Sequence, residues 1–283
     1  MPNKRASELL GYPSDARLLI LNADDFGMYD AINDAVVSSF KEGVVRSTTL
    51  MAPCPRASRA MDLLKEHPEI VFGVHLTVIC DIPTYRYGPL APKAKTRSLV
   101  EDDGCFHRIE HLHGFLDQAK LDELEIEFRA QIEALLSTGL KPTHLDWHCL
   151  ASGGRPDVFD MTVGLAKEYG LAIRVSGQQF IEQMRRQGLP ANDHNLLDSF
   201  ALESEGKTAR YTQMLRDLPA GLSEWAIHPG LDTTEAKSID PDGWSVRNAD
   251  FEFLISQEAK DTIEEEGIIL MDYRALQSVW NAN

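Results

Sequence analysis

Residues 17–27 read RLLILNADDFG and join an apolar run to two adjacent carboxylates. Residues 18–21 are enough for a buried strand and too few to span a membrane. A buried carboxylate without a partner is costly, so Asp24 and Asp25 require water, a cation or a hydrogen-bond network. Because α/β enzymes place reactive groups at the ends of inner strands, we predict that the catalytic centre begins at this pair.

Three further segments have the same form, in which apolar residues lead into an ionisable side chain. They are IVFGVH at 70–75, PTHLDWH at 142–148 and WAIH at 225–228. In the second segment His144, Asp146 and His148 alternate, so on an extended chain they share one face. Four strand ends of this kind predict one shared rim of ionisable groups that includes His75 and His228.

A helix–glycine–strand pattern recurs along the chain, at Gly43, Gly139, Gly170 and Gly267. Glycine suits the left-handed cap that ends a helix, and repeated connections of this kind predict a mainly parallel sheet. The periodicity predicts helices at 28–40, 57–66, 121–137, 157–169, 178–187, 207–218 and 249–266. The pattern predicts about seven or eight strands, and several of them end in ionisable residues. This favours a (β/α) barrel, in which the strand ends share one mouth, over an open sheet.

The region near 80–117 breaks this pattern. Pro83, Pro89 and Pro92 fall close together, and Asp102-Asp103-Gly104 is a turn signal. We predict that this region is a long inserted loop over the active-site face of a single α/β domain spanning 1–283.

The charge composition limits the kinds of molecule that the protein is expected to bind. The formal net charge is −16, with 44 acidic and 28 basic residues among 283. Nucleic acids and anionic membranes reward clustered basic residues, so neither is expected as a partner, whereas a neutral sugar is not repelled. The four cysteines are widely spaced, and no secretory signal or membrane-spanning segment is recognisable. These features predict a cytoplasmic protein.

The rim residues suggest metal-dependent hydrolysis. Two histidines and one carboxylate can hold a divalent ion with positions open for water and substrate. The second aspartate of the pair is then free to act as a base, and His228 can protonate a leaving group. Cys149 follows His148, but no third group orients it as a nucleophile, so thiol catalysis is disfavoured. The pattern predicts a hydrolase of amides or esters.

Five motifs together resemble the YdjC-like carbohydrate deacetylases, a family that includes chitooligosaccharide deacetylases. They are NADDFG at 22–27, STT at 47–49, GVHLT at 73–77, PTHLDWH at 142–148 and HPG at 228–230. The resemblance implies a distorted (β/α) barrel of about seven parallel strands and one divalent metal ion, either Mg²⁺ or Zn²⁺. It also implies removal of acetyl groups from N-acetylated sugars or oligosaccharides, and a homodimer.

The resemblance also implies roles for individual residues. Asp25, His75 and His148 would bind the metal, Asp24 would be the general base, and His228 would be the general acid. His144 and Asp146 would contact the substrate or support the ligands. The choice between Asp24 and Asp25, and between His144 and His148, as ligands stays open at this point.

The chain departs from the family where Cys149, Leu150 and Ala151 follow His148, since further histidines are common there. This departure bears on the identity of the sugar and leaves the metal ligands intact. Beside the deacetylase, two alternatives remain open. One is a metal-dependent phosphoesterase or other amidohydrolase on a related barrel. The other is a sugar-binding protein without turnover.

Overall fold

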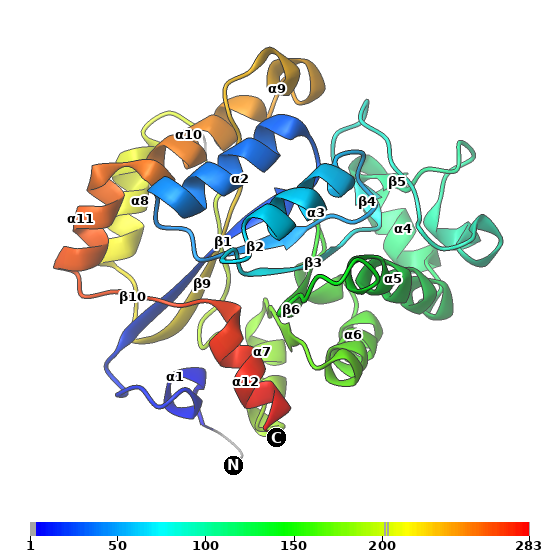
Figure 1. The fold of residues 1–283 in the computed structure, drawn as a ribbon. Coiled ribbons are helices and arrows are strands. Elements are labelled where there is room, and N and C mark those ends of the chain that lie inside the picture. Colours follow the sequence, from blue (N-terminus) through cyan, green and yellow to red (C-terminus); the bar gives the residue numbers. More distant parts are fainter. Residues whose placement is uncertain (1–3, 201, 203, 283) are drawn as a thin grey trace.

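A curled parallel sheet forms the centre of the computed structural model, which describes residues 4–200, 202 and 204–282 (Figure 1). The strand order is β7-β6-β3-β2-β1-β9-β8, and β10 also pairs with β1. The strands are β1 (Arg17–Phe26), β2 (Ser47–Leu50), β3 (Phe72–Leu76), β6 (His144–Trp147), β7 (Ala172–Ile173), β8 (Leu197–Asp198), β9 (Gly221–Ile227) and β10 (Ile269–Leu270). Within the described residues β7 and β8 do not pair, so the barrel is half open, which confirms the predicted distorted barrel.

Strand β1 is a central strand of the sheet. It pairs with β9 from Arg17 to Ala23, and its carboxyl half pairs with β2. Residues 18–23 are almost completely buried, which explains why both faces of the strand carry apolar residues. The register with β2 shifts between Ala23 and Phe26, where Asp25 has φ = 69°.

Helices cover both faces of the sheet (Figure 1). They are α1 (Ala6–Leu9), α2 (Asp30–Glu42), α3 (Ala57–Glu66), α4 (Leu112–Gln118), α5 (Leu121–Leu136), α6 (Pro156–Tyr169), α7 (Gln178–Arg186), α8 (Lys207–Arg216), α9 (Thr234–Ile239), α10 (Trp244–Ile255), α11 (Gln257–Glu265) and α12 (Tyr273–Asn281). Gly170 ends α6 with φ = 66°, as predicted for a left-handed cap. Gly43 is different, because it is extended and a Cβ there would lie 2.5 Å from the carbonyl oxygen of Leu254.

The single helix predicted at 249–266 is wrong. The chain forms two helices, α10 and α11, which are separated by Ser256 in an extended conformation. The Ser256 hydroxyl accepts a hydrogen bond from the backbone N–H of Ala259 and so begins the second helix. Helix α10 also begins earlier than predicted, at Trp244. The sequence pattern missed α1, α4, α9, α12 and β8.

The region near 80–117 carries short elements rather than a structureless loop. Strands β4 (Ile79–Cys80) and β5 (His107–Arg108) pair in parallel, and 3₁₀ turns lie at Lys93–Lys95, Arg97–Leu99 and Ile109–His111. Glu127 of α5 accepts hydrogen bonds from the backbone N–H groups of Leu90 and Ala91, at 3.1 and 2.9 Å. The region is therefore docked on α5, beside the carboxyl end of β3 (Figure 1).

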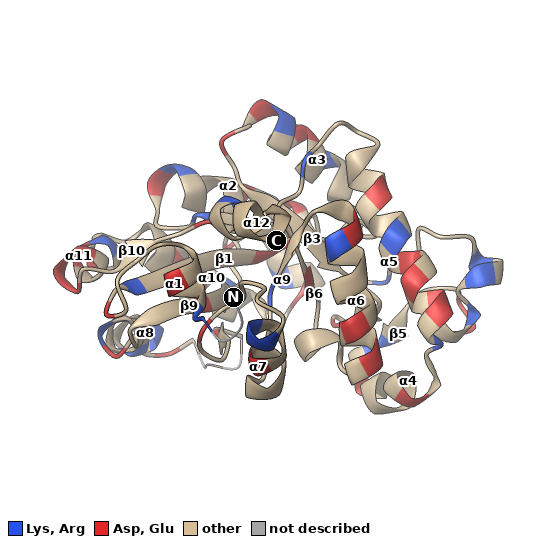
Figure 2. Cartoon of the chain, turned by 90° about the horizontal axis from the view of Figure 1, so that it is seen from below, with Lys and Arg blue, Asp and Glu red and all other residues tan. Residues whose placement is uncertain are grey.

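Charges of both signs are interspersed along the outer helices (Figure 2). Arg129 of α5, for example, pairs with Glu125 at 2.9 Å and with Glu168 of α6 at 2.6 Å. None of the helices in the described part of the chain has the length and apolar composition needed to cross a membrane.

Candidate active site and metal centre

Five predicted site residues line one cavity of about 850 Å³ at the carboxyl ends of the parallel strands. They are Asp24, Asp25, His75, His148 and His228. Because the strands are parallel, residues that follow or end β1, β3, β6 and β9 meet at the same edge of the sheet. His144 and Asp146 lie behind this group and do not line the cavity.

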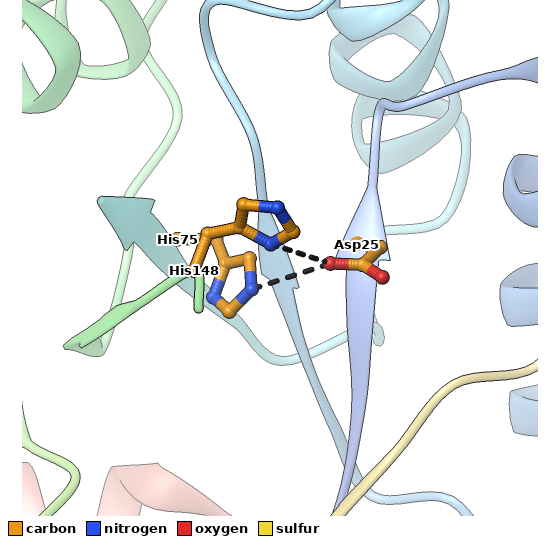
Figure 3. A group of neighbouring side chains, drawn as sticks. All are labelled: Asp25, His75 and His148. Carbon is orange, nitrogen blue, oxygen red and sulfur yellow. Dashed lines mark hydrogen bonds and ion pairs between the residues drawn. The ribbon is translucent and has the colours of Figure 1, made fainter. Parts of the chain in front are cut away.

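Asp25 is at the centre of the group (Figure 3). Its Oδ1 lies 3.3 Å from Nε2 of His75 and 3.2 Å from Nδ1 of His148. Its Oδ2 accepts a hydrogen bond from Nη1 of Arg247 at 2.7 Å. Burial opposes ionisation of Asp25, but Arg247 and the two histidines hold its pKa well below the usual range. Asp25 is therefore a carboxylate, which is the form that binds metal ions.

The orientation of His75 is set by Asp146. The Nδ1–H of His75 donates to Oδ1 of Asp146 at 2.6 Å, so Nε2 is the ring nitrogen that faces Oδ1 of Asp25, at 3.3 Å. Burial alone lowers the pKa of His75, but Asp146 and the aspartate pair raise it to about 9. A carboxylate behind a histidine is the arrangement that commonly orients histidine ligands of metals.

The donor set fits a divalent cation. One ligand atom each from Asp25, His75 and His148 lies within 4.8 Å of the others. Bonds of about 2.1 Å to a common ion place neighbouring donors about 3.0–3.4 Å apart, and the nitrogen atoms of His148 and His75 lie 3.2 and 3.3 Å from Asp25 Oδ1. Two imidazoles and one carboxylate accommodate several divalent ions, and the imidazole nitrogens suit zinc better than magnesium, but the donors do not name a single metal.

Asp24 lies next to Asp25 but has different partners. Arg174 binds both of its oxygens, and the same guanidinium contacts Asp146 at 2.8 Å and Glu224 at 2.7 Å. Glu224 in turn accepts a hydrogen bond from the hydroxyl of Tyr273 at 2.5 Å. Nε2 of His75 is 4.0 Å from Asp24, farther than from Asp25, which supports Asp25 as the ligand.

Sequence reasoning did not assign Arg174 to the site. The residue directly follows β7, so the same signal applied, namely an apolar run that leads into an ionisable side chain. Arg247 gave no such signal, because it lies within α10 and reaches Asp25 only through the tertiary fold.

His228 follows β9 and is held by groups from two other segments. Its Nδ1 lies 2.9 Å from Oγ of Ser199, and its backbone N–H donates to Asp250. The Ser199 hydroxyl donates to Asp250 at 2.5 Å, so its oxygen accepts from Nδ1–H of His228. Asp250 also accepts from Lys207 and Tyr211, both at 2.6 Å. Nε2 of His228 therefore remains as the ring atom that can exchange a proton.

His144 is packed beneath the site. Its ring stacks on Tyr273, with centroids 3.5 Å apart and an interplanar angle of 5°. Its Nδ1 lies 3.0 Å from the Thr143 hydroxyl oxygen, and burial holds its pKa well below the usual range. A Cβ at Gly73 would lie 2.6 Å from this ring, so glycine is needed at that position. The contacts favour His148 over His144 as the ligand.

The backbone is strained around the cavity. In the described part of the chain, the non-glycine residues with positive φ are Asp25, Cys149 and Ser152, and all three line the cavity. Such conformations are costly and persist where the surrounding structure enforces them, often at functional sites.

Fold and site together define a parallel α/β protein with a buried acid–histidine centre at the carboxyl end of its sheet. The model of the YdjC-like protein family matches residues 18–265. The carbohydrate deacetylase of Thermoanaerobacter pseudethanolicus is 30% identical over 264 residues, which cover 92% of this chain and 100% of that protein. The carbohydrate deacetylase of Clostridium beijerinckii is 30% identical over 261 residues, covering 90% and 98%.

A solved structure has the same fold. A crystal structure from Enterococcus faecalis V583, described as that of a cellobiose-phosphate cleavage protein, is similar with a TM-score of 0.79 and 28% sequence identity. The similarity covers 92% of this chain and 99% of that chain. The protein therefore belongs to the YdjC-like family.

Proposed function

We propose that this protein removes the acetyl group from an N-acetylated sugar or oligosaccharide by metal-dependent hydrolysis. The observation that carries the proposal is the position of Asp25 Oδ1 between nitrogen atoms of His75 and His148, in a cavity that Asp24 and His228 also line. The names of the curated relatives support the same reaction class.

Asp25, His75 and His148 would hold one divalent ion, either Mg²⁺ or Zn²⁺. When bound, the ion supplies Lewis acidity toward the amide carbonyl and lowers the pKa of water. Asp146 contributes by fixing Nε2 of His75 toward the site. Arg247 balances the charge of Asp25 through its other oxygen.

Asp24 is the proposed base. Burial opposes its ionisation, but Arg174 keeps its pKa below the usual range, so the carboxylate is charged and can accept the proton of the attacking water. The water oxygen forms a bond to the carbonyl carbon, and the carbon–nitrogen bond then breaks. The proton on Nε2 of His228 passes to the departing nitrogen, which leaves as the sugar amine, while acetate carries the new oxygen. The proton that Asp24 took from water then returns to His228 through solvent.

The cavity favours an uncharged substrate. The lysine and arginine residues among its described lining are Arg174 and Arg247, and both are bonded to carboxylates. Asp198 and Asp242 also line the cavity and are exposed. These charges suit a neutral sugar and its cationic amine product better than an anionic substrate.

Acetate release from a panel of N-acetylated mono- and oligosaccharides, before and after chelation and metal add-back, tests the proposal. We expect release that chelation abolishes and one divalent ion restores. Asp25→Asn is expected to lose metal binding, whereas Asp24→Asn and His228→Gln should bind the ion and lose turnover. Phosphate esters are the matched substrate control.

Two outcomes would overturn the assignment. Turnover of phosphate esters without acetate release would identify a phosphoesterase. Sugar binding by the metal-loaded, folded protein without acetate release from any sugar would identify a binding protein.

A further inference from the structure

The second ring nitrogen of His148 faces a different group of donors. While Nδ1 lies 3.2 Å from Asp25, Nε2 lies 3.1 Å from Oδ1 of Asp81 and 3.3 Å from Sγ of Cys149. One ligand atom from each of Asp81, His148 and Cys149 lies within 4.8 Å of the others. This group also lines the cavity, on the side of the region near 80–117.

The three donors come from two segments of the fold, the residues that follow β4 and those that follow β6, and they are held in place. Asp81 follows β4, and its Oδ1 also accepts a hydrogen bond from the hydroxyl of Tyr87 at 3.3 Å. Arg247 lies 3.9 Å from the other oxygen of Asp81, so Oδ1 stays directed at His148. Cys149 has φ = 58°, a conformation that cysteine rarely adopts.

The chemistry of this group differs from that of the Asp25 centre. A thiolate, an imidazole and a carboxylate together favour a thiophilic cation such as zinc or cadmium, whereas magnesium prefers oxygen donors. Cys149 is an exposed residue in the lining of the cavity. Cys54 and Cys80 are buried and offer no comparable access.

A neutral imidazole has one proton and one lone pair. When Nδ1 of His148 binds an ion beside Asp25, Nε2 carries the proton and donates it toward Asp81 or Cys149. When Nε2 binds an ion, the proton moves to Nδ1 and is donated to Asp25. A neutral imidazole therefore binds one ion at a time, and binding at both nitrogens would require its deprotonation to imidazolate.

We propose that Asp81, His148 and Cys149 form a second binding site, for a thiophilic divalent cation such as Zn²⁺ or Cd²⁺, which excludes the hydrolytic ion because His148, when bound through Nε2, no longer offers a lone pair on Nδ1 beside Asp25. The existence of the site rests on its own three donors, while the exclusion rests on the proposed role of His148 in hydrolysis. Binding forms one bond from the cation to Sγ and releases the thiol proton to solvent. No oxidant or reductant is needed.

Cadmium titration of the purified, chelator-treated protein tests the site without any assay of hydrolysis. We expect an ultraviolet cadmium–thiolate charge-transfer band that saturates at one ion per chain. The band should be absent from Cys149→Ser and unchanged in Cys105→Ser, the matched control, because Cys105 does not line the cavity. A band that persists in Cys149→Ser, or that is lost in Cys105→Ser, would overturn the site.

Displacement of Mn²⁺ tests the exclusion. The protein is loaded with Mn²⁺, Cd²⁺ is added, and free Mn²⁺ is measured by electron paramagnetic resonance. We expect one Mn²⁺ released per thiolate-bound Cd²⁺, with Cys149→Ser requiring roughly 100-fold more Cd²⁺ because one ligand is lost. Formation of the thiolate band while Mn²⁺ stays bound would refute exclusion. If Mn²⁺ does not bind in the first place, the proposed hydrolytic centre fails instead, and the charge-transfer result still decides the second site.

Discussion

The guanidinium of Arg174 binds both carboxylate oxygens of Asp24, with Nη1 2.7 Å from Oδ2 and Nη2 2.8 Å from Oδ1. Both residues are buried, so the pair lies where charge interactions are screened little by water. The contact fixes the position of the proposed base as well as its charge.

Replacing Arg174 by Met is expected to lower kcat by about 100-fold, because Asp24 loses both its charge partner and its fixed position. Burial raises the pKa of Asp24 and Arg174 lowers it, so the variant should ionise Asp24 only at higher pH. The acid limb of the pH–rate profile should therefore move to higher pH. Arg129→Met, which removes a surface ion pair, is the control. An unchanged acid limb with full activity would contradict the assignment of Asp24.

Replacing Ser199 by Ala removes the acceptor for Nδ1–H of His228, so the ring can adopt the other tautomer or rotate. We expect kcat to fall by about tenfold, with little change in KM, since proton delivery to the amine is impaired. Ser199→Thr keeps the hydroxyl and should restore most of the rate. Nitrogen chemical shifts of His228 report the tautomer directly. A rise in KM at constant kcat would instead indicate a role in substrate binding.

Gly73→Ala is expected to destabilise the protein by about 1–3 kcal/mol, because overpacking forces neighbouring groups to shift. The new Cβ would lie 2.6 Å from the ring of His144, which is itself stacked on Tyr273. Gly164→Ala in α6 is the matched control, since a Cβ there meets nothing within 4 Å. This control should gain about 0.5–1 kcal/mol from the higher helix propensity of alanine. Urea unfolding of both variants measures the difference, and equal stabilities would refute the close packing at Gly73.

A phosphorylated N-acetylated disaccharide should be a poorer substrate than its neutral counterpart, with kcat/KM lower by about tenfold or more at low salt. The reason is that Arg174 and Arg247 are bonded to carboxylates, while Asp198 and Asp242 are exposed in the cavity. Asp198→Asn should reduce the difference in kcat/KM between the phosphorylated and the neutral sugar without improving turnover of the neutral sugar. A preference for the phosphorylated sugar would show that a cationic group is freed on binding.

Much of the fold could be predicted because its signals are local. The apolar run before Asp24 predicted β1, and the stripe that includes Phe128 and Ile132 predicted α5. Ser256 was overlooked because a helix break needs only one extended residue, whose own hydroxyl caps the next helix. Such a break barely alters the hydrophobic period.

The same distinction between local and tertiary signals applies to the residues of the candidate site. Asp25, His75 and His148 were predictable because each lies at or just beyond the end of a strand, and parallel strands bring their ends together. Arg247 and Asp250 were not, because they lie inside α10 and reach the rim from a packed helix. Asp81 follows a two-residue strand that has no periodic signal.

The region near 80–117 is attached to α5 in a way that allows its own side chains to change. Glu127 binds the backbone N–H groups of Leu90 and Ala91, and Gln131 binds both the N–H and the carbonyl of Thr77, just before the region begins. Backbone groups are present whatever the side chains are, so these contacts place little demand on the sequence of the region itself. The sequence of this part of the cavity rim can thus change while the helix that anchors it stays the same.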